Sequence, residues 1–576
     1  MGELIRLRDV SFAFPGKPPV LHHINLSVQQ GEFVGIVGAT SSGKSTLLQI
    51  MCGVIPHFTR GDLQGTVELR GADTRTLSLS KIARYTGVVS QDPENQLFNL
   101  IVKDEVAWAL ENRGVDPRVM DDRINAMLDF MHIRGLKERI TYDLSGGEKQ
   151  RLVLAATYIA EPEILFLDNP ASMLDPVGAE MFITSVRDII ARGQTVVMIE
   201  DKIDELVEHA HRIVALDKGS IVIDCPAEEL NQHIDQLLAA NIRPPRLMDF
   251  SNRLKREFHF TSLNADSDDS TTTLKSALLP YLAHVQPAPA STNGTSHTHA
   301  LVKVENLNFV YPPPRRIEAL SNINFTLNQG EFVAIVGQNG SGKTTLSRCM
   351  SGYLKPTTGH TLIDGQDVLR LKLKERTRVV GYVFQNPDHQ IFLDEVYKDV
   401  AFGPKNLGWK PDEIQSKVDD VLKKLGLWEK RDLHPYRLSK GDRQRLAIAA
   451  VVVMEPKVLI VDEPTTGLDP VQARAVMDLL AHFRDNTGMT IIVVTHAMEL
   501  VAEYCDRVLV MYGGKLLLDG PTREVFSQRD VLLQTRVQPP PITRLALDMD
   551  WRPPPLTVDE ALARLAPALR GEAVAQ

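Results

Sequence analysis

VLIVDEPTTGLDP, residues 458–470, is the stretch from which the fold of this chain can be predicted. Its four leading apolar residues predict a buried parallel strand. Asp462 and Glu463 follow at the carboxyl end of that strand, which is where open α/β sheets bind their ligands. With a phosphate-binding loop upstream, Asp462 can hold Mg²⁺ and Glu463 can polarise a water for attack on a phosphate. We therefore predict one competent ATP-hydrolysing site, with Glu463 as its base.

The chain contains a second copy of this stretch, ILFLDNPASMLDP at residues 164–176, in which Asn169 follows the aspartate. Upstream, GEFVGIVGATSSGKSTL at residues 31–47 recurs as GEFVAIVGQNGSGKTTL at residues 330–346, and the other paired motifs follow at nearly constant spacing. An internal repeat of this kind indicates two homologous halves.

Composition narrows the possible classes of protein. With 576 residues, the chain is expected to hold about three or four domains at ~150 residues each. Its net charge of −9 argues against nucleic acid as the main partner, because phosphate-backbone binding needs a basic face. The four cysteines have no metal-site spacing, which favours reduced core thiols. We find no apolar run near the ~20 residues of a membrane span and no signal-peptide core, so we expect a cytosolic chain whose membrane role comes through partners.

Two glycine-rich loops have the spacing G-x-x-x-x-G-K-[ST]. In such loops backbone N–H groups and a helix dipole hold phosphates, the lysine neutralises charge, and the final hydroxyl reaches Mg²⁺. Two loops in register, each followed by a strand that ends in aspartate, predict two nucleotide sites. Their predicted ATP-binding residues are Gly38, Ala39, Thr40, Ser41, Ser42, Gly43, Lys44, Ser45 and Thr46 in the first half, and Gly337, Gln338, Asn339, Gly340, Ser341, Gly342, Lys343, Thr344 and Thr345 in the second.

LSGGE at residues 144–148 completes an ordered set of motifs. A glycine-rich loop, a glutamine loop, an LSGGE segment, a strand with a terminal aspartate and an LDP turn, in that order, resemble the ATP-binding cassette (ABC) family. The resemblance implies that the two cassettes pair head to tail within the chain. Each ATP would then lie between the phosphate loop of one half and the LSGGE-like segment of the other.

The predicted fold class is α/β, with two tandem P-loop ABC nucleotide-binding domains. Each is expected to have an antiparallel β subdomain, a parallel-sheet core, a helical subdomain and a small C-terminal extension. Helical spacing predicts the helical subdomains at residues 102–131 and 396–425. The predicted divisions are a first ATPase domain with degenerate catalytic residues at 1–225, its extension at 226–283, a flexible linker at 284–300, a second, competent domain at 301–525, and its extension at 526–576.

The site on the second half's loop contains every group that the resemblance implies for hydrolysis. The expected catalytic residues are Glu463, His496, Gln385 and Lys343, and the expected metal ligands are Thr344, Gln385 and Asp462. Tyr311 is expected to stack on adenine, and Ser145, Gly146 and Gly147 of the first half are expected to complete the site.

The site on the first half's loop departs from this pattern. Its expected residues are Phe14 for adenine, Ser45, Gln91 and Asp168 for the metal, Lys44 for phosphate, and Ser439 and Gly441 from the other half. Asn169 replaces the base, Asp201 stands in place of the histidine, and Lys440 interrupts the partner segment, LSKGD. An alternative for Lys440 is that it reaches the phosphate itself and partly restores the lost contact. Loss of a general base costs about 10²–10⁴ in rate. A carboxylate beside the γ-phosphate adds about 1–4 kcal/mol of repulsion. We therefore expect this site to bind ATP and hardly hydrolyse it.

The tails of the glutamine loops, QDPENQLF at residues 91–98 and QNPDHQIF at 385–392, resemble those of the ATPases of energy-coupling factor transporters. The resemblance implies an ATPase at the cytoplasmic face of the membrane that powers import of a vitamin, a vitamin precursor or a transition-metal ion. Its partners would be a T-type membrane scaffold protein and a small solute-binding membrane protein. The alternatives are the fused ATPase of a conventional importer, such as one for sugars, and a soluble cassette protein that acts on ribosomes or DNA.

Overall fold

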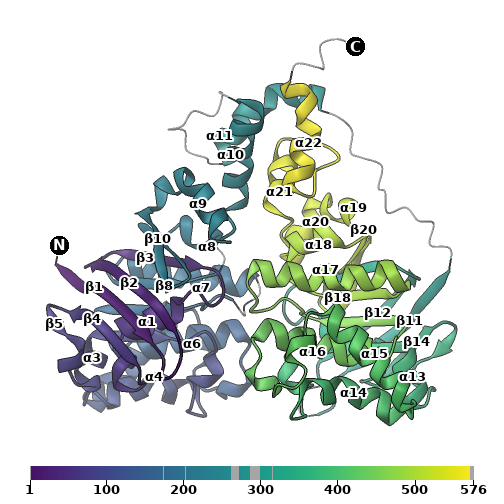
Figure 1. Cartoon of the computed structure of the whole chain (residues 1–576), viewed down its shortest axis with the longest axis horizontal. Coiled ribbons are helices and arrows are strands. Elements are labelled where there is room, and N and C mark those ends of the chain that lie inside the picture. Colours follow the sequence, from purple (N-terminus) through teal and green to yellow (C-terminus); the bar gives the residue numbers. More distant parts are fainter. Residues whose placement is uncertain are drawn as a thin grey trace. The chain divides into compact units, whose positions relative to one another are not determined.

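The computed structural model describes residues 2–172, 174, 176–201, 203–260, 271–285, 299–313 and 316–570. The chain divides into two compact units, Met1–Asn252 and Arg253–Gln576, which are described separately here (Figure 1). Most of the predicted linker, residues 286–298, lies outside the described residues.

The first unit opens with an antiparallel sheet in the strand order β2-β1-β4-β5. Along β1 and β2, buried residues are interspersed with exposed ones, as expected for a sheet with one face on a core. All pairs of this sheet are antiparallel, so the predicted antiparallel start of the first half is confirmed. The strands are β1 (Glu3–Ala13), β2 (Pro19–Gln29), β4 (Asp62–Leu69) and β5 (Ala72–Asp73).

A second sheet of the first unit has the order β10-β9-β3-β8-β7-β6, and all its pairs are parallel except β9 with β10. Every residue of β3 and β8 is buried, because helices and the small sheet cover both faces. In β7, Leu165 and Leu167 join the core beneath the helices, while Ile164 and Phe166 join the core beneath the small sheet. The strands are β3 (Phe33–Gly38), β6 (Thr86–Val89), β7 (Ile164–Asp168), β8 (Thr195–Ile199), β9 (Arg212–Asp217) and β10 (Ser220–Pro226).

Helices confirm the predicted helical subdomain of the first half. It consists of α4 (Val102–Glu111), α5 (Pro117–Phe130) and α6 (Gly146–Tyr158), whose apolar faces form one cluster with β7. The other helices are α1 (Lys44–Met51), α2 (Val54–His57), α3 (Leu79–Tyr85), α7 (Pro176–Ile190), α8 (Asp204–Val207) and α9 (Ile234–Ala239), while α10 (Arg246–Phe258) spans the division between the two units.

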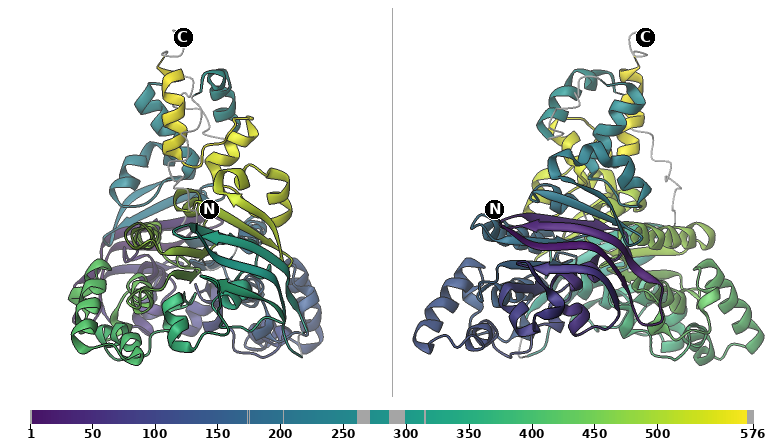
Figure 2. Two further views of the ribbon diagram at one scale, coloured as in Figure 1. Left: turned by 90° about the vertical axis from the view of Figure 1, so that its right-hand side faces the viewer. Right: turned by 60° about the vertical axis from the view of Figure 1, so that its left-hand side comes forward.

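The second unit repeats this architecture (Figure 2). Its small sheet has the order β12-β11-β14-β15 and its large sheet the order β16-β17-β18-β13-β19-β20. The strands are β11 (Ala300–Val310), β12 (Glu318–Asn328), β13 (Phe332–Val336), β14 (Thr358–Ile363), β15 (Gln366–Asp367), β16 (Val380–Val383), β17 (Val458–Asp462), β18 (Thr490–Val494), β19 (Arg507–Tyr512) and β20 (Lys515–Pro521). The helices of this cassette are α12 (Lys343–Met350), α13 (Leu373–Val379), α14 (Val396–Leu407), α15 (Pro411–Lys424), α16 (Lys440–Val452), α17 (Pro470–Thr487), α18 (Met498–Tyr504) and α19 (Thr522–Phe526).

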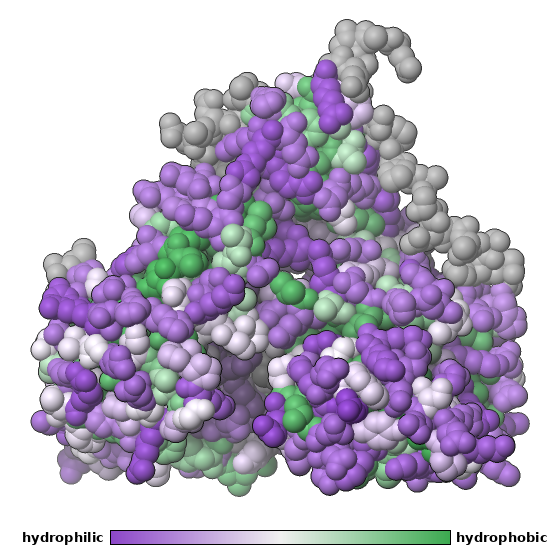
Figure 3. All heavy atoms as spheres, in the orientation of Figure 1, coloured by the Kyte–Doolittle hydropathy of each residue, from purple (hydrophilic) through white to green (hydrophobic). Residues whose placement is uncertain are grey.

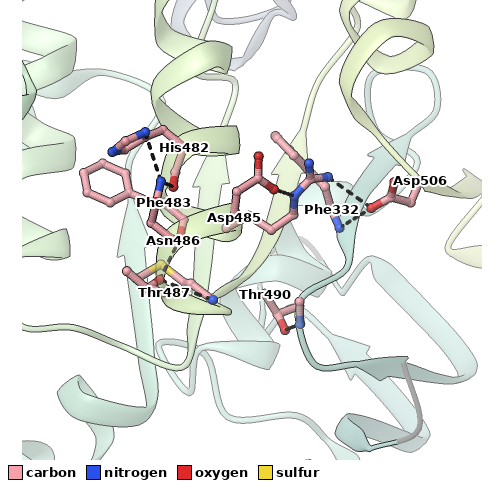
Figure 4. Close-up of polar contacts among 11 residues, drawn as sticks. Phe332, His482, Phe483, Asp485, Asn486, Thr487, Thr490 and Asp506 are labelled. Carbon is pink, nitrogen blue, oxygen red and sulfur yellow. Dashed lines mark hydrogen bonds and ion pairs between the residues drawn. The ribbon is translucent and has the colours of Figure 1, made fainter. Parts of the chain in front are cut away.

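Polar contacts fix α17 against the strand that leads into the phosphate loop (Figure 4). Asp506 accepts a hydrogen bond from the backbone N–H of Phe332 at 3.0 Å and pairs with Arg484 of α17 at 3.3 Å. Thr490 accepts from the backbone N–H of Gly330 at 2.9 Å, next to the start of β13. These bonds hold the register of the strand on which the second loop is built.

The C-terminal extension of the first half divides between the two units. From Arg253 on it belongs to the second unit, where Arg253 pairs with Asp559 at 2.5 Å and Lys275 pairs with Asp548 at 2.7 Å. Short helices are present in both extensions, as α11 (Thr271–Leu278) in the first and α20 (Arg529–Thr535), α21 (Pro541–Asp548) and α22 (Val558–Leu569) in the second. None of the helices within the described ranges is long and apolar enough to span a membrane.

Candidate active site

The phosphate loop of the second half packs so closely that only glycine fits at its start. A Cβ atom on Gly337 would lie 2.2 Å from the carbonyl oxygen of Met511. The buried Lys343 closes the loop on itself, because its ammonium donates to the carbonyls of Gly337 at 2.7 Å and Gln338 at 3.1 Å. Ser341 Oγ is buried and makes no hydrogen bond within the described part of the chain. A loop that wraps a lysine and leaves a buried hydroxyl unpaired fits a bound phosphate chain.

The loop of the first half has the same form. Lys44 donates to the carbonyls of Gly38 at 2.7 Å and Ala39 at 3.1 Å, and Ser42 Oγ is buried without a hydrogen-bond partner among the residues described. Ser41 adopts a φ of 66°, where the second half uses a glycine. Such a conformation costs an ordinary residue roughly 1–3 kcal/mol. The other contacts of the first loop therefore stabilise Ser41 in this left-handed conformation.

The candidate metal ligands lie beside each loop. Thr344 Oγ1 donates to Asp462 Oδ1 at 3.4 Å, and Ser45 Oγ donates to Asp168 Oδ1 at 3.2 Å. Burial raises the pKa of both aspartates above its ordinary value. A hydroxyl and a carboxylate held together in this way are oxygen ligands of the type that Mg²⁺ prefers. Both sites fit the ion.

Glu463 lies at the end of β17 with a left-handed φ of 50°, and its N–H donates to Val494 O at 2.8 Å. Its Oε1 is 3.1 Å from His496 Nε2, and its Oε2 accepts from Thr466 Oγ1 at 3.1 Å. Burial raises the pKa of this carboxyl from 4.5 to about 7, although Lys343 opposes the rise. A carboxylate whose pKa lies near neutrality suits general-base catalysis.

In the first half, Asn169 stands at the position of Glu463 and Asp201 at the position of His496. Asn169 Nδ2 donates to Asp201 Oδ2 at 3.2 Å, and Asp201 Oδ1 is 3.2 Å from the ammonium of Lys44. The amide of Asn169 cannot take a proton, and its Oδ1 is buried and unpaired among the described residues. The structure thus brings Lys44, Asn169 and Asp201 together in one cluster.

The two LSGGE-like segments differ at their helix starts. Ser145 caps α6, where Glu148 Oε2 accepts from both its hydroxyl and its N–H at 2.8 Å, and Gly146 and Gly147 form the first turn. Ser439 caps α16 through the N–H of Asp442 at 3.2 Å. The shorter carboxylate of Asp442 pairs with Lys430 and Arg445 instead of closing the box. In α16, Gly441 lies beside Gln472, since a Cβ on it would come within 3.0 Å of that side chain.

The predicted adenine and glutamine-loop residues lie on strands and loops around these centres. Phe14 and Tyr311 occupy equivalent half-buried positions, and Tyr311 OH is 3.0 Å from Thr345 Oγ1. Gln91 donates to Ser172 Oγ at 3.2 Å, while Gln385 is exposed after β16. Their contacts with nucleotide and metal remain predictions.

Sequence reasoning missed two residues of the second site. Tyr382 OH donates to Asp462 Oδ2 at 2.9 Å, and Thr466 holds Glu463 as described above. Val88 occupies the place of Tyr382 in the first half, so the tyrosine is an asymmetry between the two metal sites. Comparison of the two halves residue by residue along β16 and β6 would have shown it.

Comparisons with known proteins agree with this geometry. A family model described as "ABC transporter" matches residues 21–172 and 320–466. A protein of Methanosarcina mazei described as an ABC transporter ATP-binding protein is 36% identical over 560 residues, which are 95% of this chain and 94% of that protein. One of Caldanaerobacter subterraneus with the same description is 35% identical over 551 residues, which are 94% of this chain and 95% of that protein.

Two solved structures each match less than half of this chain. The structure of cbiO1 from Clostridium perfringens, described as part of the ABC transporter complex cbiONQ, is 40% identical and covers 44% of this chain and 99% of that one, with a TM-score of 0.38. The ATP-binding cassette MJ0796, in a dimeric post-hydrolysis state with ADP and Pi, is 28% identical and covers 38% of this chain and 99% of that one, with a TM-score of 0.36.

Proposed function

Because this chain belongs to the ABC transporter ATP-binding proteins, and is therefore an ATPase that binds ATP and Mg²⁺, we propose that it powers a membrane importer of the energy-coupling factor type. The imported solute would be a vitamin, a vitamin precursor or a transition-metal ion. The partners would be a T-type scaffold protein in the membrane and a small membrane protein that binds the solute. The chain itself would lie at the cytoplasmic face of the membrane.

One observation carries this proposal, namely a pair of exposed aromatic rings in each half, of which one ends the tail of the glutamine loop and the other lies on the helix that follows. Phe98 and Trp108 are 58% and 46% exposed, with their ring centroids 5.1 Å apart. Phe392 and Phe402 are 61% and 41% exposed, with centroids 4.8 Å apart. Large apolar side chains left exposed at equivalent places in both halves favour a docking site for another protein. Patches of hydrophobic residues are visible on the surface drawn in Figure 3.

The same support holds each aromatic pair in place. In the first half, the buried Glu105 of α4 accepts from the N–H groups of Phe98 at 3.1 Å and Asn99 at 2.7 Å. In the second half, the buried Asp399 of α14 accepts from Phe392 at 3.4 Å and Leu393 at 3.2 Å. A buried carboxylate that fixes a turn beneath exposed rings makes them a rigid surface. Movement at the glutamine loop would thus be transmitted to whatever docks there.

Hydrolysis is proposed for the second half's site alone. Glu463 takes a proton from the attacking water, His496 holds that carboxylate in position, and Lys343 binds phosphate. Thr344 and Asp462 would hold Mg²⁺, which would supply positive charge to neutralise the phosphates. Head-to-tail pairing, with Ser145 completing this site, is part of the proposal. The first half's site binds nucleotide without appreciable turnover, since Asn169 cannot act as a base.

The test is to purify the protein from native membranes in mild detergent and identify the co-purifying proteins by mass spectrometry. The proposal expects one scaffold-like membrane protein and one small membrane protein, both lost when Phe98 and Phe392 are changed together to serine. Leu533→Ser, at a site 67% exposed on α20, is the matched control and should retain both. A pair of ordinary permease subunits would instead indicate a conventional importer. Ribosomal proteins, or retention of both partners in the double variant, would refute the docking surface.

A further inference from the structure

In the first half, the carboxylate of Asp201 forms an ion pair with Lys44, the lysine of the phosphate-binding loop. We propose that Asp201 makes this loop selective for nucleoside diphosphates over nucleoside triphosphates. The proposal rests on the nucleotide-binding role assigned above to the first half's loop, and it goes further in naming the ligand class and the residue that selects it.

The contacts of Lys44 give the first step. An ammonium has three N–H donors. Those of Lys44 have three acceptors, namely the carbonyls of Gly38 at 2.7 Å and Ala39 at 3.1 Å and the carboxylate of Asp201 at 3.2 Å. The lysine is 6% exposed at its side chain and Asp201 is 16% exposed, so water weakens this ion pair only partly. An entering phosphate must therefore compete with an internal anion.

A second contact fixes the anion in place. The other oxygen of Asp201 accepts from Asn169 Nδ2 at 3.2 Å, so both carboxylate oxygens are engaged. Asn169 is itself held by a backbone hydrogen bond to Ile199 at 2.9 Å. The carboxylate is thus positioned from two sides, and any displacement of it breaks two contacts.

The position of Lys44 explains why Asp201 lowers the affinity for a third phosphate in particular. A loop lysine of this kind reaches the β- and γ-phosphates, whereas the loop N–H groups hold the phosphates nearer the ribose. A diphosphate keeps the contacts to the loop N–H groups and adds no charge beyond its β-phosphate. A triphosphate adds one more negative charge near Asp201. Repulsion between unit charges about 4 Å apart, even in water-like surroundings, corresponds to a factor of about five in affinity, and to more in a partly buried site.

The second half shows the contrast. His496 occupies the equivalent position and lies 3.1 Å from the carboxylate of Glu463. An imidazole carries no negative charge and can donate a hydrogen bond to a phosphate. The two loops, although similar in backbone and lysine geometry, therefore differ in where the carboxylate near the lysine stands: it is Glu463 at the strand end in the second half, and Asp201, at the position of His496, in the first.

The experiment measures nucleotide affinity in the full-length protein. Lys343→Ala weakens the second loop, and equilibrium dialysis with radiolabelled ADP and ATP at fixed free Mg²⁺ then reports the first. ADP is expected to bind about tenfold more tightly than ATP. Asp201→Asn, which removes the charge and keeps the shape, should bring the two affinities within about twofold. Asp201→Glu should keep the preference for ADP. The Lys44→Ala, Lys343→Ala double variant sets the background.

Equal affinities in the parent, a preference for ATP, or an unchanged ratio in Asp201→Asn would each overturn the proposal. Absence of binding above background for both nucleotides would overturn it as well. If Asp201→Asn does not fold, as judged by its melting temperature, Asp201→Ser tests the same loss of charge. Failure of the importer proposal is recognised separately, because it is read from co-purifying proteins and not from nucleotide affinities.

Discussion

Replacing Glu463 by glutamine is expected to abolish hydrolysis and, at alkaline pH, to stabilise the protein. The first effect follows from loss of the base, which typically lowers kcat by about 10²–10⁴. The second follows from the pKa of the carboxyl, which burial raises from 4.5 to about 7. Each pKa unit corresponds to about 1.4 kcal/mol. The buried carboxylate therefore costs about 3 kcal/mol once it is fully ionised.

The sign of the pH dependence follows from proton binding. The folded state holds the Glu463 proton more tightly than the unfolded state, so stability falls as pH rises from about 4.5 through about 7. Glutamine does not titrate and can still accept the hydrogen bond from Thr466. The variant should match the parent near pH 4 and exceed it by about 3 kcal/mol at pH 8.

Urea unfolding followed by tryptophan fluorescence measures this difference. Three of the four tryptophans, Trp409, Trp428 and Trp551, lie in the second unit, so the signal reports mainly on the half that contains Glu463. Asn169→Gln is the matched control, because it exchanges one neutral side chain for another in the first half. Any change it causes should be independent of pH.

Two results would refute the reasoning. If Glu463→Gln retained kcat within tenfold of the parent, the base would be another group. If the difference in unfolding free energy between the variant and the parent were the same at pH 5 and pH 8, burial would not raise the pKa of the Glu463 carboxyl.

The remaining predictions concern the asymmetry between the two halves. Ser145→Arg should lower ATPase activity at least tenfold more than Ser439→Arg, because only Ser145 is proposed to face the competent site. Equal losses of activity in a phosphate-release assay would contradict the proposed head-to-tail pairing. Tyr382→Phe should raise the Mg²⁺ concentration for half-maximal turnover several-fold, because the phenol donates to Asp462, the proposed metal ligand; an unchanged concentration would leave the tyrosine a packing residue. Asn169→Glu should lower the free energy of unfolding of the first unit by about 1–3 kcal/mol, because it places two carboxylates in contact. Adding Asp201→His should recover most of that loss. If calorimetry shows that the two changes in unfolding free energy simply add, the two positions are independent.

Much of the fold could be predicted because its signals are local. The strand predicted from the apolar residues 458–461 is present as β17, and the helical subdomains lie where helical spacing predicts them. The division of the first extension between the units could not be predicted, because the sequence of an extension carries no signal for the unit on which it packs. Tyr382 was missed for a related reason: a single tyrosine in a buried strand gives no sign that it contacts an aspartate 80 residues away.

The two catalytic departures of the first half are best understood as one exchange. In the second half an acceptor, Glu463, stands at the strand end and is paired with His496; in the first half a donor, Asn169, stands there and is paired with Asp201. A side-chain contact is kept in both, but the carboxylate stands at the strand end in the second half and at the position of His496 in the first. Under the proposed roles, this one difference removes the base and places a carboxylate beside Lys44. Sequence comparison counts two substitutions, whereas the contacts join Asn169, Asp201 and Lys44 in one cluster, as the proposed loss of hydrolysis at the first half's site requires.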